Sequence, residues 1–292
     1  MNKQQDKFMT ELTRLLESQN FQSEEEMEKF LNDLMGKDIS SFKNKPSTNK
    51  EKAQDLVYEA YDLTPAIAKK KIEKALQLDP DCIEAYEYLG DTEESIQKAD
   101  AFYEKGIEIG RRLFCGEKYN EYKGYFWGIV ETRPFMRCLR DHAEILYLLG
   151  KKKECVEIFE EMIEFNPNDN QGVRDQLMLY LIELNEDSKY EKYFKMFKNE
   201  DKAFSLFNYA LYTFKKEGDT LKSKKQLQKA LKQNKYVAKK ILSALPIVEL
   251  AEYYGIGDEN EADYYVSYAQ PIWWETKGAI DWLKSIVQCL NC

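Results

Sequence analysis

The sequence predicts an all-α protein, and three observations support this. Among 292 residues there are only 13 Gly and 7 Pro, fewer than all-β folds or glycine-rich nucleotide-binding folds usually require. The chain is rich in Leu, Glu, Lys, Ala and Gln, the residues that form helices readily. No segment alternates apolar and polar positions between turn dipeptides, as a half-buried strand would.

Composition and charge exclude several classes of protein. A hydrophobic content of 43% with 13% aromatic residues is too high for a disordered chain. The longest purely apolar run, Leu177 to Ile182, is too short to span a bilayer. The N-terminal residues lack the apolar segment of a secretory signal, so we expect a cytoplasmic protein. A net charge of -9 argues against a dedicated nucleic-acid binder.

The six cysteines predict neither a disulfide framework nor a metal site. Without a secretory signal, reduced thiols are expected. Cys289 and Cys292 form a Cys-x-x-Cys pair, but a second ligand pair is missing and the single histidine, His142, is far away in sequence. An incidental pair is favoured over a metal or redox site. We expect no cofactor and no metal.

The N-terminal residues 1–36 predict a helical hairpin. Ser23 and Glu26 form a capping-box pattern that opens the second helix, and Gly36 closes it. Residues 37–50 are polar and are predicted to be a linker. The hairpin is expected to cap the helices that follow it, with a mobile arm as the alternative. The first helix carries an apolar stripe made of Phe8, Leu12, Leu15 and Leu16.

Residues 51–292 show an internal period that is typical of paired helices. In a repeat of about 34 residues, small side chains stand where two antiparallel helices approach each other. Counting back from Pro167 places Ala143 and Cys155 at such positions, and Gly150 at the turn between the two helices.

Other segments match the same period. A unit that ends at Pro80 is followed by one with Gly90 at a small position, and Gly218 and Gly257 mark inter-helix turns in later units. A last helix is expected from Ala279 to Leu290. Together these matches predict about six helix pairs.

The period resembles that of the tetratricopeptide-repeat (TPR) superfamily. More narrowly, Phe126-Trp127-Gly128, residues 131–137 and residues 166–174 look like segments of a group of bacterial repeat proteins. That group is remotely similar to the suppressor-of-tumorigenicity repeat proteins. The resemblance covers roughly residues 53–283 and implies a right-handed α-solenoid of TPR-like hairpins that binds other proteins. Some relatives carry a Cys-rich metal-binding segment, but this sequence has no Cys-x-Cys run, so zinc is not implied.

The sequence offers little support for catalysis. It contains no Gly-x-Ser-x-Gly, no His-Glu-x-x-His and no glycine-rich phosphate loop. His142 falls at a repeat position that is normally packed, so a half-buried histidine is favoured over a general base. Carboxylate pairs such as Glu160-Glu161 are typical of a solvated helix face. We therefore predict that the protein is not an enzyme.

The candidate site is a group of arginines in the concave groove. The resemblance places Arg137, Arg140, Arg174 and Asn208 at groove-facing positions of successive repeats. Because a guanidinium binds carboxylate or phosphate through two hydrogen bonds, such a row could bind an acidic peptide or the C-terminal carboxylate of another protein.

Two readings of these arginines stay open. The arginines could instead pair with Glu131, Glu144 or Asp175 and hold adjacent helices together. The repeat before them also places Glu84 and Glu87 in the groove, so one part of the groove would be positively charged and another part negatively charged.

Two further groups of side chains are predicted to be structural. The aromatic residues near 126–135 and the tryptophans Trp273, Trp274 and Trp282 are expected to pack between helices, with an exposed protein-binding surface as the alternative. No acidic residue lies between Asp219 and Glu249, where lysines accumulate. A solvated outer face is favoured there, and contact with RNA or an anionic membrane is the alternative. The lysines are Lys222, Lys224, Lys225, Lys229, Lys232, Lys235, Lys239 and Lys240.

The sequence thus predicts a non-catalytic scaffold or adaptor that binds another protein or an acidic peptide through the concave groove. The alternative is a regulatory protein that contacts nucleic acid through its lysine-rich face. The identity of the partner and the oligomeric state stay open.

Overall fold

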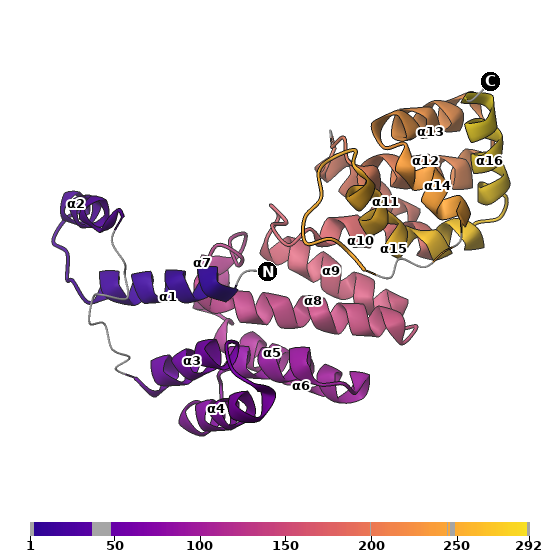
Figure 1. Cartoon of the computed structure of the whole chain (residues 1–292). Coiled ribbons are helices and arrows are strands. Elements are labelled where there is room, and N and C mark those ends of the chain that lie inside the picture. The colour runs from indigo at the N-terminus through magenta and orange to yellow at the C-terminus, as the bar shows by residue number, and fades with distance from the viewer. Residues whose placement is uncertain (1–2, 37–47, 199, 244, 246–248, 291–292) are drawn as a thin grey trace. The chain divides into compact units, whose positions relative to one another are not determined.

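The structure is a computed structural model that describes residues 3–36, 48–198, 200–243, 245 and 249–290 (Figure 1). Within these residues every regular element is helical, which confirms the all-α prediction. No helix among them is long and apolar enough to cross a membrane. The chain divides into two compact units, residues 1–151 with 161–170 and residues 152–160 with 171–292.

The first unit consists of two N-terminal helices, two helical hairpins and a further helix packed on the second hairpin. In the hairpins α3 packs against α4 and α5 packs against α6, and α8 lies against both α5 and α6. Helix α9 (Lys152–Phe165) contributes to both units. The other helices are α1 (Lys3–Glu17), α2 (Glu24–Leu34), α3 (Asn49–Ala60), α4 (Pro65–Leu78), α5 (Ile83–Thr92), α6 (Ile96–Leu113), α7 (Glu117–Tyr122), the 3-10 turn η2 (Val130–Thr132) and α8 (Arg133–Leu148).

Capping side chains fix where α2 and α3 begin. The Ser23 hydroxyl accepts a hydrogen bond of 3.2 Å from the backbone N–H of Glu26, which is one half of the capping box that the sequence predicts; the Glu26 carboxylate accepts instead from the Gln22 N–H at 2.9 Å. Thr48 and Glu51 form a complete capping box, in which the Thr48 N–H donates to the Glu51 carboxylate at 2.7 Å. Helix α3 therefore begins at Asn49, inside the segment that the sequence predicts to be a linker. The rest of that predicted linker, residues 37–47, lies outside the described residues.

Small residues allow the helices of each hairpin to approach closely. Ala68 and Ala75 on α4 are completely buried, as is Ile72 between them. At Gly90 on α5, an added Cβ would lie 2.4 Å from the ring of Tyr103 on α6. Because that separation is far below van der Waals contact, the close packing of α5 on α6 requires glycine.

An aromatic cluster joins the loop before α8 to the end of α9 within the first unit. Phe126 stacks on Phe165 with ring centroids 4.6 Å apart, and Phe135 packs beside them. Phe126 and Phe135 are fully buried, as predicted, whereas Trp127 is half-buried and lies against the Arg133 guanidinium. These rings hold the start of α8 in place.

The second unit is built from pairs of helices as well. Helix α10 packs against α11, α12 against α13, and α14 against α15. Gly218 turns the backbone between α12 and α13 with φ +72, a conformation that favours glycine. The helices are α10 (Val173–Leu184), α11 (Asp187–Met196), α12 (Ala203–Glu217), α13 (Leu221–Gln233), α14 (Tyr236–Ser243), α15 (Glu259–Glu275) and α16 (Ala279–Leu290).

The last helices agree closely with the sequence prediction. Helix α16 has the expected bounds, and Trp273 and Trp282 are buried in the second unit. Trp274 differs, because 46% of its surface is exposed, although its indole N–H donates to the backbone carbonyl of Ile241. The right-handed solenoid of six TPR-like hairpins stays a prediction.

Candidate functional site

The surface that α5 and α8 form under α1, here called the inner face of the first unit, centres on Arg137 of α8. Its side chain is almost completely buried, and the residue has only 4% of its surface exposed. Nε donates to the Glu87 carboxylate at 2.5 Å and Nη2 to Glu84 at 3.4 Å, both on α5. Nη1 donates to Asp6 of α1. Three carboxylates from two helices therefore surround one guanidinium.

Helix α1 lies on this face through a single row of polar side chains. Lys3 pairs with Glu87, and Asp6 pairs with Arg137 and, at 2.6 Å, with Arg133. Farther along, the Thr10 hydroxyl lies 3.0 Å from the Tyr58 hydroxyl, and Arg14 donates to Asp55 at 2.7 Å. The spacings of three, four and four residues place the four side chains on one face of α1.

Burial controls the protonation equilibria at this face. Burial raises the pKa of Glu84 to about 7, while the positive charge of Arg137 opposes the rise. Burial by itself would lower the pKa of Arg137, but Glu87, Glu84 and Asp6 together hold it above its usual value. The second oxygen of Glu87 is buried and has no hydrogen-bond partner among the described residues. The guanidinium is thus held charged by an excess of carboxylates.

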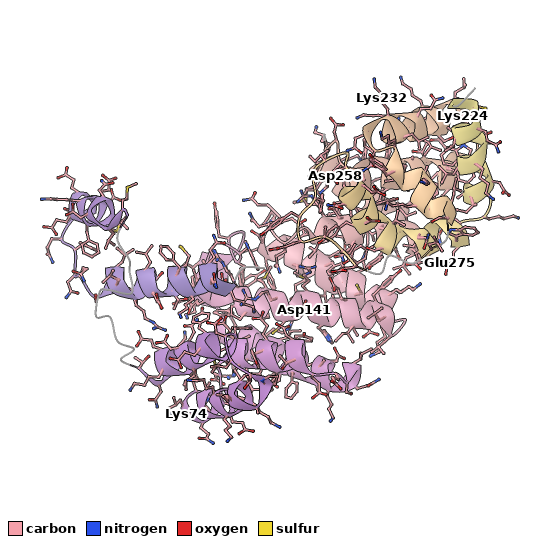
Figure 2. The ribbon with its side chains drawn as sticks, viewed as in Figure 1. Lys74, Asp141, Lys224, Lys232, Asp258 and Glu275 are labelled. Atoms are coloured by element: carbon pink, nitrogen blue, oxygen red, sulfur yellow. The ribbon has the colours of Figure 1, made fainter. Side chains whose placement is uncertain are left out.

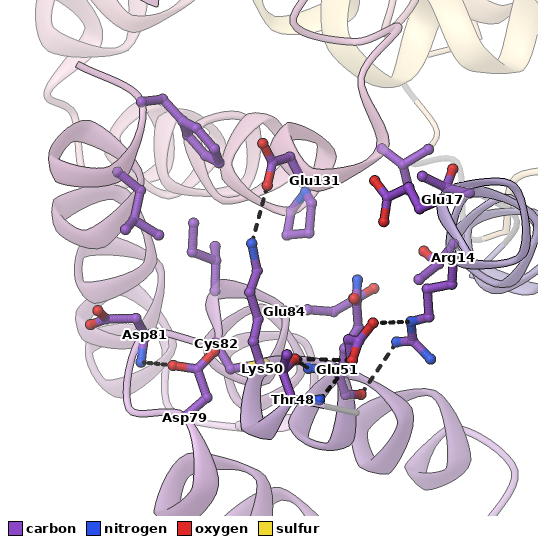
Figure 3. Close-up of a pocket in the computed structure, with 18 residues that line it drawn as sticks. Arg14, Glu17, Thr48, Lys50, Glu51, Asp79, Asp81, Cys82, Glu84 and Glu131 are labelled. Atoms are coloured by element: carbon purple, nitrogen blue, oxygen red, sulfur yellow. Dashed lines mark hydrogen bonds and ion pairs between the residues drawn. The ribbon is translucent and has the colours of Figure 1, made fainter. Parts of the chain in front are cut away.

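A cavity of about 310 Å³ opens beside Arg14, between α1, α3, α5 and the loop before α8 (Figure 3). Lys50 reaches across it to Glu131 at 3.1 Å, and Arg14 approaches Glu51. Two basic side chains face a larger acidic set, so the cavity favours positively charged groups. The acidic residues in its lining are Glu17, Glu51, Asp79, Asp81, Glu84 and Glu131.

In the second unit, Arg174 and Asn208 line one cavity of about 280 Å³. The Arg174 guanidinium lies over the Phe197 ring and pairs with Glu200 at 2.7 Å. Asn208 is 1% exposed, and its amide nitrogen lies 3.4 Å from the Asp175 carbonyl. The Asn208 amide oxygen is buried without a hydrogen-bond partner among the described residues.

A second charged pair stands beside this cavity. Lys202 pairs with Asp175 at 2.8 Å. Burial raises the pKa of Asp175 to about 6, and Lys202 opposes the rise. The cavity therefore combines paired charges with one unsatisfied amide oxygen.

The structure places the four predicted site residues as two pairs. Arg137 and Arg140 share α8, whereas Arg174 and Asn208 share the cavity of the second unit. Arg140 is half-buried and pairs with Glu144, one turn away on the same helix, at 3.2 Å. The partner is the one that the alternative expectation names, but the pair lies within α8 and does not join adjacent helices. A continuous row of all four residues stays a prediction.

Sequence reasoning missed the polar face of α1. It identified the apolar stripe of this helix, of which Leu15 is buried, whereas Phe8 is 48% exposed. A signal is present, since Lys3, Asp6, Thr10 and Arg14 recur at helical spacing. The role of these four side chains could not be predicted from the spacing, because their partners lie up to 131 residues away in sequence.

The lysine side chains of α13 lie on its exposed face, and several of their charges are paired. Figure 2 shows Lys224 and Lys232 on its outer surface. Lys222 pairs with Glu217 at 2.5 Å and Lys229 with Asp201 at 2.8 Å. Lys225 and Lys232 have no ion-pair partner among the described residues.

Comparisons with protein-family models, with curated proteins and with solved structures find no match. The resemblance to TPR proteins therefore rests on the sequence pattern, and the function is inferred from the geometry of these sites.

Proposed function

We propose that the protein is a non-catalytic scaffold, built from TPR-like helix pairs, that binds a helix of another protein on the inner face of its first unit. One observation carries the proposal: this face already holds a helix, α1, through side chains that recur along one face of α1. A surface that binds one helix by specific polar contacts can bind another with the same pattern.

The contacts of α1 define the chemistry of that partner. Its helix would place a cation at Glu87, a carboxylate between Arg133 and Arg137, and a second cation at Asp55. This pattern is of mixed charge, and the acidic cavity of Figure 3 extends it towards further cations. In the first unit we therefore propose a mixed-charge helix rather than the purely acidic peptide that the arginines suggested.

The direct test uses a peptide in place of the partner. In the full-length protein, Lys3→Glu, Asp6→Lys and Arg14→Glu together reverse the charges of the docking face of α1. A fluorescein-labelled peptide of residues 1–20 is then titrated with this variant and with the unaltered protein, and binding is followed by fluorescence anisotropy. The variant is expected to bind the peptide at least about tenfold more tightly, because tethered α1 competes at an effective concentration on the order of millimolar.

A matched peptide with the same three charge reversals serves as the control and should not bind. The proposal fails if the unaltered peptide binds neither protein, or if the two peptides bind equally well. Circular dichroism of the variant checks that the repeats stay folded without docked α1.

In the second unit the acidic-peptide proposal still applies. The Asn208 amide oxygen can accept a hydrogen bond from a peptide N–H, and Arg174 beside it can exchange Glu200 for a ligand carboxylate. Affinity capture with Arg174→Ala/Asn208→Ala should lose a partner that the unaltered protein retains. Lys225→Ala/Lys232→Ala is the matched control. If all three proteins capture the partner equally well, the cavity does not bind it.

Nucleic-acid binding through α13 is the second candidate, and the exposed Lys225 and Lys232 favour it. Retention on heparin that weakens steeply with salt, or a raised ratio of absorbance at 260 to 280 nm in the purified protein, would support it. The absence of retention at low salt would eliminate it. For either function we propose a cytoplasmic setting, which the free thiols of the described cysteines support.

A further inference from the structure

A second cluster of polar side chains lies between α6 and α8, apart from the α1 docking face. Asp100 and Glu104 are one turn apart on α6, and His142 extends from the neighbouring α8. Nδ1 of His142 lies 2.5 Å from a carboxylate oxygen of Asp100. One ligand atom from each of the three residues lies within 4.8 Å of the other two.

We propose that Asp100, Glu104 and His142 bind one divalent transition-metal ion, with Zn²⁺ as the best match to the donor set. One imidazole nitrogen and two carboxylate oxygens are ligands that zinc accepts in tetrahedral sites. Three protein ligands leave a fourth position for water or for a group from a partner. The two carboxylates together balance the charge of the ion.

The positions of these ligands on the helices allow a shared ion in place of the simple hydrogen bond. A pair between His142 and Asp100 alone does not involve Glu104, which is exposed and has no hydrogen bond or ion pair among the described residues. Residues four apart on a helix project to the same side, so both carboxylates can approach the imidazole together.

Metal binding requires only small side-chain movements. In a tetrahedral zinc site with bonds of about 2.0 to 2.2 Å, ligand atoms lie roughly 3.3 Å apart. The oxygen of Asp100 would therefore move slightly away from Nδ1, and the Glu104 carboxylate would approach. Glu104 is exposed and the other two residues are half-buried, so rotation of the side chains suffices.

The ligands of this site come from two helices, so no short motif marks them in the sequence. The sequence-based expectation of no metal rests on the cysteine pair and on its distance in sequence from His142. Asp100 and His142 are 42 residues apart, and only the packing of α6 on α8 brings them together.

The single histidine of this protein makes the test unusually direct. The full-length protein is titrated with Zn²⁺, and proton NMR follows the one imidazole Cε1–H signal. The thiols at Cys115, Cys289 and Cys292 are first replaced by serine, because they could bind zinc themselves. The signal is expected to move and to stop moving at one equivalent of zinc.

Two variants decide whether the proposed ligands act together. Asp100→Asn/Glu104→Gln should weaken zinc binding at least about tenfold. Even the loss of a residue that only hydrogen-bonds to a metal ligand lowers metal affinity roughly 10- to 100-fold. Glu108→Gln, which removes a carboxylate from the same helix, should leave the affinity unchanged. The proposal is overturned if zinc leaves the imidazole signal in place, or if the Asp100/Glu104 variant binds zinc as tightly as its parent. Circular dichroism verifies that each variant is folded.

Discussion

Arg137 and Arg174 are both predicted from the sequence to face a peptide groove, yet their surroundings differ. Arg137 is buried among three carboxylates, and one of these belongs to the N-terminal helix of the same protein. Arg174 is less buried, lies on an aromatic ring, and lines a cavity beside an unsatisfied amide oxygen. Arg137 is thus fully paired and buried in the first unit, whereas Arg174 lines a cavity in the second unit.

This difference shows that an arginine at a groove position does not by itself define an anion site. The available charge depends on which carboxylates the rest of the fold brings to it. Glu84, Glu87 and Asp6 already neutralise Arg137, and for this reason the partner proposed for the first unit is a helix that replaces α1 rather than a free carboxylate.

The largest expected effect is the loss of Arg137. Arg137→Ala removes the cation shared by three buried carboxylates and should lower the free energy of unfolding by about 3 to 5 kcal/mol, although Glu87 keeps Lys3 and Asp6 keeps Arg133. Arg174→Ala should cost only about 1 kcal/mol, because its partner Glu200 is more accessible to water. Thermal and urea unfolding measure both changes. Arg140→Ala on the same helix is the control for Arg137. Equal losses of stability in the three variants would contradict the proposed difference between Arg137 and Arg174.

The next largest effect concerns the docking of α1. Asp6→Ala removes the carboxylate that joins α1 to Arg133 and Arg137, and should destabilise that contact by about 1 to 3 kcal/mol. Hydrogen exchange of the α1 amides should accelerate, while exchange in α12 stays unchanged. Gln5→Ala, at an exposed neighbouring position, is the matched control. If exchange in α1 is already unprotected in the unaltered protein, α1 is not docked.

The pH dependence of the free energy of unfolding should show how strongly burial raises the carboxylate pKa values in the first unit. Glu84 has a pKa of about 7 in the folded protein and an ordinary value of 4.5, so the folded state holds its proton more tightly. This contribution to stability is present below about pH 4.5 and is lost as pH rises through about 7. Asp141, whose pKa burial raises to about 7, acts in the same direction.

Unfolding measured between pH 4.5 and 7.5 should therefore show a falling contribution from these two groups. Glu84→Gln and Asp141→Asn should each make the curve flatter than that of the unaltered protein. A curve that stays unchanged in both variants would show that neither carboxylate titrates in this range.

The smallest effect is expected on the lysine-rich face. Lys225→Ala/Lys232→Ala removes charges that have no ion-pair partner among the described residues, so stability should change by less than about 0.5 kcal/mol. Thermal unfolding measures this change. A larger loss of stability would show that these lysines contribute to the fold, and they would then be a poor control.

Local patterns predicted much of the fold. The capping residue Ser23, the turn at Gly218 and the bounds of α16 are all readable from short-range sequence, because caps, turns and helical periods depend on neighbouring residues. Glycines at close helix contacts, such as Gly90, follow from the repeat pattern for the same reason.

The sites were less predictable because their partners are far apart in sequence. Arg137 was predicted to face a groove, which stays a prediction, and nothing local to it indicates that Asp6 of α1 would reach it. Likewise, the apolar stripe of α1 did not reveal that its polar row makes the long-range contacts. Ion pairs of this kind depend on the packing of whole helices, which periodicity in one sequence does not encode.

A double-mutant cycle between Asp6 and Arg137 tests most directly whether the inner face of the first unit binds α1. Asp6→Asn, Arg137→Gln and the double variant are unfolded under the same conditions in the full-length protein. If α1 is docked as described, the two changes should be coupled by about 1 to 3 kcal/mol. If their effects add to within about 0.3 kcal/mol, the two side chains do not interact, and the helix-binding face is contradicted.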